Sequence, residues 1–297
     1  MKKKNKMFNI RVALSLIVYL TCISTFAASN IDNQLSELEK SINAKIGVYT
    51  IDTNTNQIIS HRGDERFPIQ STFKAIGVAA LLHQADTEHD LLNKHIAYTA
   101  KDVVNWSPVT KLHIQSGMTL RDLSQATISY SDDTAINLIM QQLGGPKAVT
   151  DFAHSIGNQS FNVSHYEANL NSDPENHQDT ATPRDMAMSL QRLTLGDVLS
   201  TVNRQQLVTW MQNNTTGNKR IRAGVPVGWT VADKTGSGSF GVANDIGIMW
   251  SPACKPIVLA IYTVSYDKDA RWRDDIIAKT TSIIFENLAK TDSCMRS

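Results

Sequence analysis

Five runs of alternating or continuous apolar residues predict β-strands, and they lie toward the two ends of the chain. The first two flank residues 52–56, a polar stretch typical of a hairpin turn. The runs cover residues 46–51, 57–61, 229–232, 246–250 and 257–264. This distribution predicts one sheet to which both ends of the chain contribute.

The chain between these ends has the punctuation of short helices. Thr182, Pro183 and Gly196 fit, in this order, a helix cap, a first helical residue and a stop. Residues 71–214 are therefore expected to form a helical block inserted between the strands. A short helix is expected before the first strand and a longer one after the last. No repeat or Gly/Ser-rich linker divides the chain, which excludes repeat arrays.

The first 27 residues predict a cleavable secretory signal peptide. Four lysines and Arg11 precede an apolar run that starts at Val12, and small residues end it at Ala27 and Ala28. The run is shorter than the roughly 20 apolar residues that a spanning helix needs, so a retained membrane anchor is the weaker interpretation. We therefore expect a secreted protein without stable membrane association.

The overall charge argues against nucleic-acid binding. The 29 Lys and Arg residues nearly balance 28 Asp and Glu residues, and no basic stripe stands out along the chain. Removing the predicted signal peptide takes away five positive charges, so the net charge changes from +1 to 1 − 5 = −4. The eight histidines form no zinc-binding motif, and no metal site is expected.

Two cysteines, Cys254 and Cys294, remain after the predicted cleavage. The strand segment 257–265 and a helix expected over 272–290 both span roughly 27–30 Å, at about 3.3 and 1.5 Å per residue. If the helix packs back across the strand, Cys294 returns toward Cys254. A disulfide and two unpaired thiols both remain open.

Candidate chemistry begins with Ser71 and Lys74 at the start of an apolar helical stretch. Residues three apart lie on one face of a helix, so the lysine can act on the serine hydroxyl. The spacing alone carries little weight, because Ser265 and Lys268 repeat it without any further motif nearby. The first pair differs because other motifs accompany it elsewhere in the sequence.

Two further motifs accompany this pair, Ser131-Asp132-Asp133 and the run Lys234-Thr-Gly-Ser-Gly. Ser-x-x-Lys, Ser-Asp-Asn and Lys-Thr-Gly together are the signature of class A β-lactamases and penicillin-binding proteins. The segment Glu167-Ala-Asn-Leu-Asn171 also fits the Glu-x-x-Leu-Asn segment of the class A Ω-loop. The chain therefore resembles a class A serine β-lactamase over nearly all of its length beyond the predicted signal peptide.

The resemblance implies a fold and a function. The fold is α/β, an antiparallel five-stranded sheet flanked by helices, with residues 28–66 and 215–297 forming the sheet lobe. Residues 67–214 form an inserted all-helical lobe, with the Ω-loop near 163–180. The activity is hydrolysis of penicillins and cephalosporins through a serine acyl-enzyme by a monomer of the bacterial periplasm. It confers antibiotic resistance and needs no cofactor.

The resemblance also implies roles for individual residues. The catalytic set is Ser71, Lys74, Ser131 and Glu167, with either Lys74 or Glu167 as the base that removes the serine proton. The implied substrate-binding residues are Trp106, Asp133, Asn171, Lys234, Thr235 and Ser237, and Asn171 is expected to hold the hydrolytic water together with Glu167. A penicillin-binding DD-peptidase and a non-hydrolytic β-lactam sensor remain as alternatives, and Glu167 with Asn171 argues against both.

Three positions depart from the class A pattern. Asp133 stands where the family usually has asparagine, so it can only accept hydrogen bonds when ionised and adds a negative charge. His165 replaces an arginine that normally pairs with the aspartate at the far end of the Ω-loop, here Asp179. Gln70 and Gly238 exclude the active-site disulfide of one carbapenemase subgroup, so carbapenem hydrolysis is not predicted.

Overall fold

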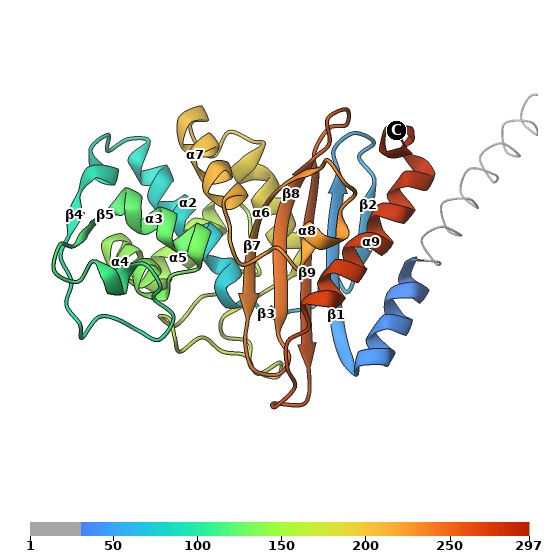
Figure 1. Ribbon diagram of the computed structural model, residues 1–297, viewed down its shortest axis with the longest axis horizontal. Coiled ribbons are helices and arrows are strands. Elements are labelled where there is room, and N and C mark those ends of the chain that lie inside the picture. The colour runs from blue at the N-terminus through green and yellow to red at the C-terminus, as the bar shows by residue number, and fades with distance from the viewer. Residues whose placement is uncertain (1–30, 297) are drawn as a thin grey trace, which may run out of the picture.

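The computed structural model describes residues 31–296 and shows a central sheet with helices on both faces (Figure 1). The five main strands are β1 (Ala44–Asp52), β2 (Ile58–His61), β7 (Thr230–Ser237), β8 (Ala243–Trp250) and β9 (Ile257–Ser265). They lie in the order β2-β1-β9-β8-β7, and every neighbouring pair is antiparallel. The predicted α/β fold with a five-stranded antiparallel sheet is confirmed.

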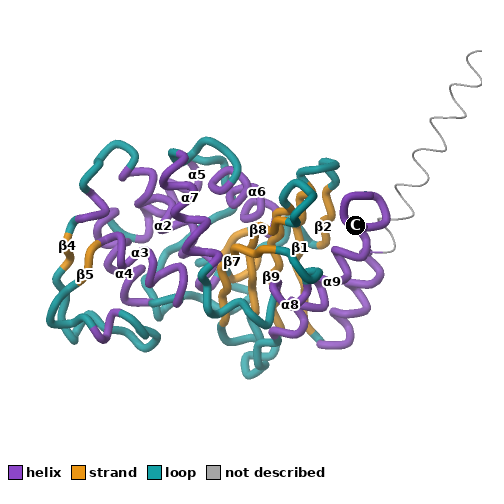
Figure 2. Tube along the Cα trace, turned by 45° about the horizontal axis from the view of Figure 1, so that its top comes forward, coloured by secondary structure: helices purple, strands orange, loops and turns teal. Residues whose placement is uncertain are grey.

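The helices divide between the two faces of the sheet (Figure 2). A helix through residues 31–42, α8 (Ile221–Gly224) and α9 (Asp274–Thr291) cover one face. The remaining helices lie on the other side and are α2 (Phe73–Ala85), α3 (Leu120–Tyr130), α4 (Asp133–Leu143), α5 (Pro146–Ser155), α6 (Pro183–Thr194) and α7 (Thr201–Gln212). Short 3-10 turns are η1 (Gln70–Thr72), η2 (Leu91–Asn93), η3 (Thr110–Leu112) and η4 (Ser293–Arg296).

Strand β9 lies in the middle of the sheet and separates two hydrophobic clusters. Its residues Ile257, Leu259 and Ile261 pack with α9 and the helix through residues 31–42. The residues between them, such as Val258 and Tyr262, pack with the helical lobe. Because both faces are covered, the strand is apolar from Ile257 to Tyr262 rather than alternating. Apolar burial on both faces therefore anchors the whole sheet.

The helical lobe is built around α2, whose residues from Phe73 to Leu82 are all buried. A helix that is apolar all round belongs in the centre of a bundle. The lobe, expected to be all-helical, also contains two ribbons, β3 (Phe67–Pro68) with β6 (Thr180–Ala181) and β4 (His95–Ile96) with β5 (Met118–Thr119). Strands of two residues are too short to leave a periodic pattern. The lobe boundaries stay a prediction.

The return of α9 across the sheet brings Cys294 to Cys254, and a disulfide joins them with 5.7 Å between their Cα atoms. Of the two alternatives that the sequence left open, the structure has the bridge. The predicted signal peptide, residues 1–27, lies outside the described residues. No helix within residues 31–296 is both long and apolar enough to cross a membrane.

Candidate active site

A cavity of about 570 Å³ lies between the helical lobe and β7. Ser71, Ser131 and Glu167 contribute to its wall from the helical side, and residues 235–239 contribute from β7 and the turn that follows it. Motifs that are more than 160 residues apart in the sequence thus share one cavity. The candidate catalytic residues therefore lie at the crevice between the two lobes.

Ser71 lies in the turn η1, directly before α2. The preceding residue, Gln70, has φ +43°, a left-handed conformation that is uncommon for residues other than glycine. At Gly236 of β7, a Cβ atom would lie only 2.9 Å from Gln70 Cβ and 3.1 Å from Ser71 N. Glycine therefore lets β7 approach the turn closely. The backbone N–H groups of Ser71 and Ser237 are the candidates to bind an oxyanion here.

Lys74 is fully buried one turn beyond Ser71. Its Nζ donates to Asp133 Oδ1 at 2.5 Å and to the Ser131 carbonyl oxygen at 2.8 Å, and lies 3.1 Å from Glu167 Oε1. Ser71 Oγ donates to the same Glu167 oxygen at 3.1 Å. The serine and the lysine therefore meet at one carboxylate.

Ser131 ends α3 in a left-handed conformation with φ +58°, which turns its side chain toward both lysines. Lys234 Nζ donates to Ser131 Oγ at 3.0 Å, and Lys74 Nζ donates to it at 3.3 Å. The next residue, Asp132, caps α4 through Ala135 N and accepts three hydrogen bonds from Val109 and Thr110. This buried cap explains why the three-residue motif folds into a fixed turn.

Asn137 of α4 holds the backbone of Glu167 in place. Asn137 Oδ1 accepts from Glu167 N at 2.9 Å, and Asn137 Nδ2 donates to Glu167 O at 2.7 Å. A carboxamide can make both contacts because it has a donor and an acceptor. The Glu167 side chain is thereby fixed over Ser71 although it comes from a long loop.

The side-chain amide of Asn171 is directed at the backbone of the Ω-loop. Its Nδ2 donates to the carbonyl oxygens of Asp173, Asn176 and Gln178 at 3.0–3.1 Å, and Asn171 is absent from the cavity wall. The amide NH2 group thus satisfies carbonyl groups inside the loop, while Oδ1 accepts from Asp173 N at 2.8 Å. The role of Asn171 in holding a water with Glu167 stays a prediction.

His165 contacts Asp179, as the altered Ω-loop suggested. His165 Nδ1 lies 2.7 Å from Asp179 Oδ2, and the carboxylate also accepts from the backbone N–H groups of Ser164, His165 and Asn171. Asp179 is fully buried, so these donors offset the cost of burying its charge. The two ends of the loop are joined at this one side chain.

Four of the other predicted substrate-binding residues line the cavity, whereas Lys234 is fully buried and is not part of its wall. Trp106 is 57% exposed, lines the cavity and donates from Nε1 to the Tyr130 carbonyl oxygen. Asp133 lines the cavity from the helical side, while Thr235 and Ser237 line it from β7. An indole exposed at the mouth offers a flat surface for a ligand.

Burial and neighbouring charges shift two pKa values in the site. Burial lowers the pKa of Lys234 to about 7, and repulsion from Lys74 adds to the shift. Burial raises the pKa of Asp133 to about 6; Lys74 opposes this shift and the nearby Glu167 carboxylate adds to it. Titrating groups of this kind are typical of catalytic sites.

Comparison with known proteins identifies the family. The sequence model of the β-lactamase enzyme family matches residues 30–288. The chain is 46% identical to β-lactamase 3 of Bacillus cereus over 262 residues, which are 88% of this chain and 82% of that protein. This chain belongs to the β-lactamase family. The class A resemblance drawn from its motifs is confirmed.

Further relatives of this β-lactamase cover almost the whole chain. The carbapenem-hydrolysing β-lactamase KPC of Klebsiella oxytoca is 41% identical over 92% of this chain and 96% of its own. A crystal structure of a β-lactamase from Desulfarculus baarsii superposes with a TM-score of 0.87 at 41% identity and covers 88% of this chain and 98% of that one. The fold of the β-lactamase is therefore shared over most of the chain.

The β-lactamase joins its nucleophile turn to the Ω-loop by hydrogen bonds. Gln70 Nε2 donates to Asn171 O at 2.6 Å and to Ser172 Oγ at 3.0 Å. Gly238 lies against the same contact, since a Cβ there would meet Ser172 Oγ at 2.6 Å. Gln70 thus connects the nucleophile turn to the Ω-loop, and glycine at position 238 leaves room for this contact.

Arg220 is a site residue of the β-lactamase that the sequence did not reveal. It is almost fully buried, and it donates to Ser237 Oγ at 2.5 Å and to the Gly236 and Asn244 carbonyl oxygens at 2.7 Å. Its Nε donates to Asp274 at 2.7 Å. No motif surrounds this arginine in the sequence. It reaches the cavity only because α8 packs against the sheet.

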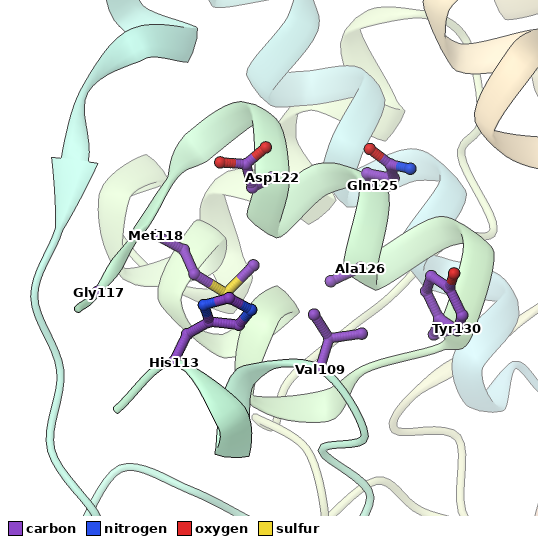
Figure 3. A pocket seen from close by; sticks show the side chains of 8 residues that line it. All are labelled: Val109, His113, Gly117, Met118, Asp122, Gln125, Ala126 and Tyr130. Atoms are coloured by element: carbon purple, nitrogen blue, oxygen red, sulfur yellow. The ribbon is translucent and has the colours of Figure 1, made fainter. Parts of the chain in front are cut away.

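A second hollow of about 410 Å³ lies along α3 (Figure 3). Its wall includes His113, Met118, Asp122 and Tyr130, and none of the predicted catalytic residues. Among residues 31–296, no group of three or more His, Cys, Asp or Glu side chains is placed to hold a metal ion. The chemistry of the β-lactamase is thus concentrated in the cavity between the lobes.

Proposed function

We propose that this β-lactamase opens the lactam ring of penicillins and cephalosporins through an ester on Ser71, and so confers antibiotic resistance. One observation carries the proposal: the Ser71 hydroxyl donates to Glu167 Oε1 at 3.1 Å inside the cavity that β7 closes. An activated serine beside a carboxylate and two candidate oxyanion donors is equipped for acyl transfer.

Acylation begins with attack of Ser71 Oγ on the lactam carbonyl carbon. The serine proton passes to a base, either Lys74 or Glu167, and the oxyanion rests on the N–H groups of Ser71 and Ser237. When the C–N bond breaks, the nitrogen takes a proton from the Ser131 hydroxyl. Lys234 lies 3.0 Å from that hydroxyl and favours its transient negative charge.

The substrate's carboxylate binds at the β7 side of the cavity. Thr235 and Ser237 present hydroxyls there, and Arg220 and Lys234 supply positive charge close behind them. Charge-assisted hydrogen bonds to a carboxylate are about twice as strong as neutral ones. This anchor orients the lactam carbonyl toward Ser71.

Deacylation distinguishes the hydrolase from its non-hydrolytic relatives. Glu167 removes a proton from a water molecule, which attacks the ester and frees Ser71. The Asn137 clamp keeps this carboxylate over the ester after acylation. We also propose that residues 1–27 direct the chain to the bacterial periplasm and that the protein acts there as a monomer.

An intact-mass time course with excess benzylpenicillin tests the function. We expect the protein to return quickly to its free mass while hydrolysed penicilloate accumulates. Ser71→Ala is the control and should gain no adduct. An adduct that persists on Ser71 would instead indicate a DD-peptidase or a β-lactam sensor.

A further inference from the structure

Lys74 is surrounded by hydrogen-bond acceptors. Its Nζ has Asp133 Oδ1 at 2.5 Å, the Ser131 carbonyl oxygen at 2.8 Å, Glu167 Oε1 at 3.1 Å and Ser131 Oγ at 3.3 Å. A charged lysine has three protons and no acceptor capacity. The two carboxylates and the carbonyl oxygen can only accept, and these three acceptors match the three protons of the ammonium form.

The Ser71 hydroxyl is directed at the carboxylate rather than at the amine. Ser71 Oγ donates to Glu167 Oε1 at 3.1 Å, and within residues 31–296 no hydrogen bond joins Ser71 Oγ to Lys74. A base must be within hydrogen-bond reach of the proton that it removes. In this arrangement only Glu167 meets that requirement.

Asp133 strengthens this division of roles. Burial opposes the charge of Lys74, yet the carboxylates of Glu167 and Asp133 outweigh it and raise the pKa of Lys74. An asparagine at position 133 would offer the same acceptor atom without the negative charge. The aspartate thus adds a full ion pair at 2.5 Å to a lysine that is completely buried.

We propose that Asp133 is a positioning residue that holds Lys74 as an ammonium, so that Glu167 alone removes the Ser71 proton during acylation. This inference rests on the proposed acyl-enzyme function and goes beyond it, because it assigns the base. Lys74 then acts as a proton donor from the start of the reaction.

The protons balance in this scheme. The Ser71 proton moves to Glu167, and the freed electron pair on Oγ forms the bond to the carbonyl carbon. As the C–N bond breaks, Ser131 protonates the nitrogen, Lys74 reprotonates Ser131 across 3.3 Å, and Glu167 returns a proton to Lys74 across 3.1 Å. The net change is one serine proton transferred to the lactam nitrogen.

The test measures the rate of adduct formation on Ser71 by rapid-quench intact mass with benzylpenicillin. We expect Glu167→Gln to slow the formation of the adduct, not only its breakdown, by about 100-fold or more, the contribution of a general base. Adding Asp133→Asn to this variant should restore adduct formation by about tenfold or more, because Lys74 can then lose its proton. The restored rate should increase with pH.

A matched control removes the same charge elsewhere. Asp151 on α5 is exposed and pairs with Lys147, so Asp151→Asn in the Glu167→Gln background should restore nothing. Adduct formation by Glu167→Gln at the wild-type rate would overturn the proposal, as would a double variant no faster than the single one. If the wild-type protein forms neither adduct nor product, the proposed function itself fails.

Discussion

We predict that Lys234 makes the catalytic efficiency of this enzyme sensitive to pH near neutrality. The side chain is fully buried, and its Nζ donates to Ser131 Oγ and to the Thr235 carbonyl oxygen at 3.0 and 2.9 Å. Burial and the nearby Lys74 lower its pKa to about 7. A lysine with a lowered pKa is charged below that pH and neutral above it, so the anchor for the substrate's carboxylate is lost as pH rises.

The size of the effect follows from the fraction of charged Lys234. With a pKa of about 7, the charged fraction falls from about one half at pH 7 to about one hundredth at pH 9. If only the charged form binds the carboxylate, kcat/KM falls about fiftyfold over this range, because kcat/KM reports the free enzyme. Lys234→Arg keeps its charge throughout and should remove this decline.

The assay is hydrolysis of benzylpenicillin at low substrate concentration and constant ionic strength, from about pH 6 to pH 9, the range that brackets the titration. Wild-type and Lys234→Arg proteins are compared at each pH. A wild-type kcat/KM that stays level between about pH 7 and pH 9 would refute the reasoning. The same decline in the arginine variant would assign it to another group.

Three further predictions follow from other contacts. Asp133→Asn should raise kcat/KM for penicillins, because an amide can donate to the substrate's side-chain carbonyl; an unchanged or lower value in steady-state assays would contradict this. Cys294→Ser should lower the free energy of unfolding, measured in urea, by about 2–4 kcal/mol, because the disulfide links residues 40 positions apart in the sequence. As a control, a reductant should destabilise the wild type and leave the variant unchanged. His165→Ala should make Ω-loop amides exchange hydrogen faster than in the wild type, because the contact with the buried Asp179 carboxylate is lost; equal protection in the two proteins would count against it.

The sheet could be predicted because its strands leave local patterns. The runs at 46–51 and 257–264 become the paired strands β1 and β9 over their whole length. The lengths predicted for β9 and α9 also make the disulfide between Cys254 and Cys294 plausible from the sequence alone. The rise per residue of a strand and of a helix determines how far apart the ends of each segment lie. Patterns of this kind depend only on neighbouring residues.

Residues of the site could be predicted from the sequence only where they belong to a known motif. Ser71, Ser131 and Lys234 come together as their motifs imply. Arg220 and Asn137 have no such signal, because each acts through backbone groups that the fold brings from distant segments.

Asn171 shows the opposite case. It stands at the expected spacing from Glu167, yet its amide is used by carbonyl groups inside the loop. Spacing along a loop without regular structure does not fix the direction of a side chain, whereas the hydrogen-bonding needs of the loop backbone do. A motif can therefore be present while one of its side chains also holds the loop together.

The charges of the two lobes favour the proposed orientation of the substrate in the cavity. The helical lobe presents one ammonium, Lys74, against two carboxylates, Asp133 and Glu167, so its side of the cavity carries an excess of negative charge. The sheet lobe presents Lys234 together with Arg220. Of these two residues, only Arg220 pairs with an aspartate at the cavity wall, Asp274. An anionic substrate is repelled by the first side and attracted to the second, and asparagine at position 133 would weaken that contrast. The aspartate thus favours a single binding orientation, in which the carboxylate lies on β7 and the lactam carbonyl faces Ser71.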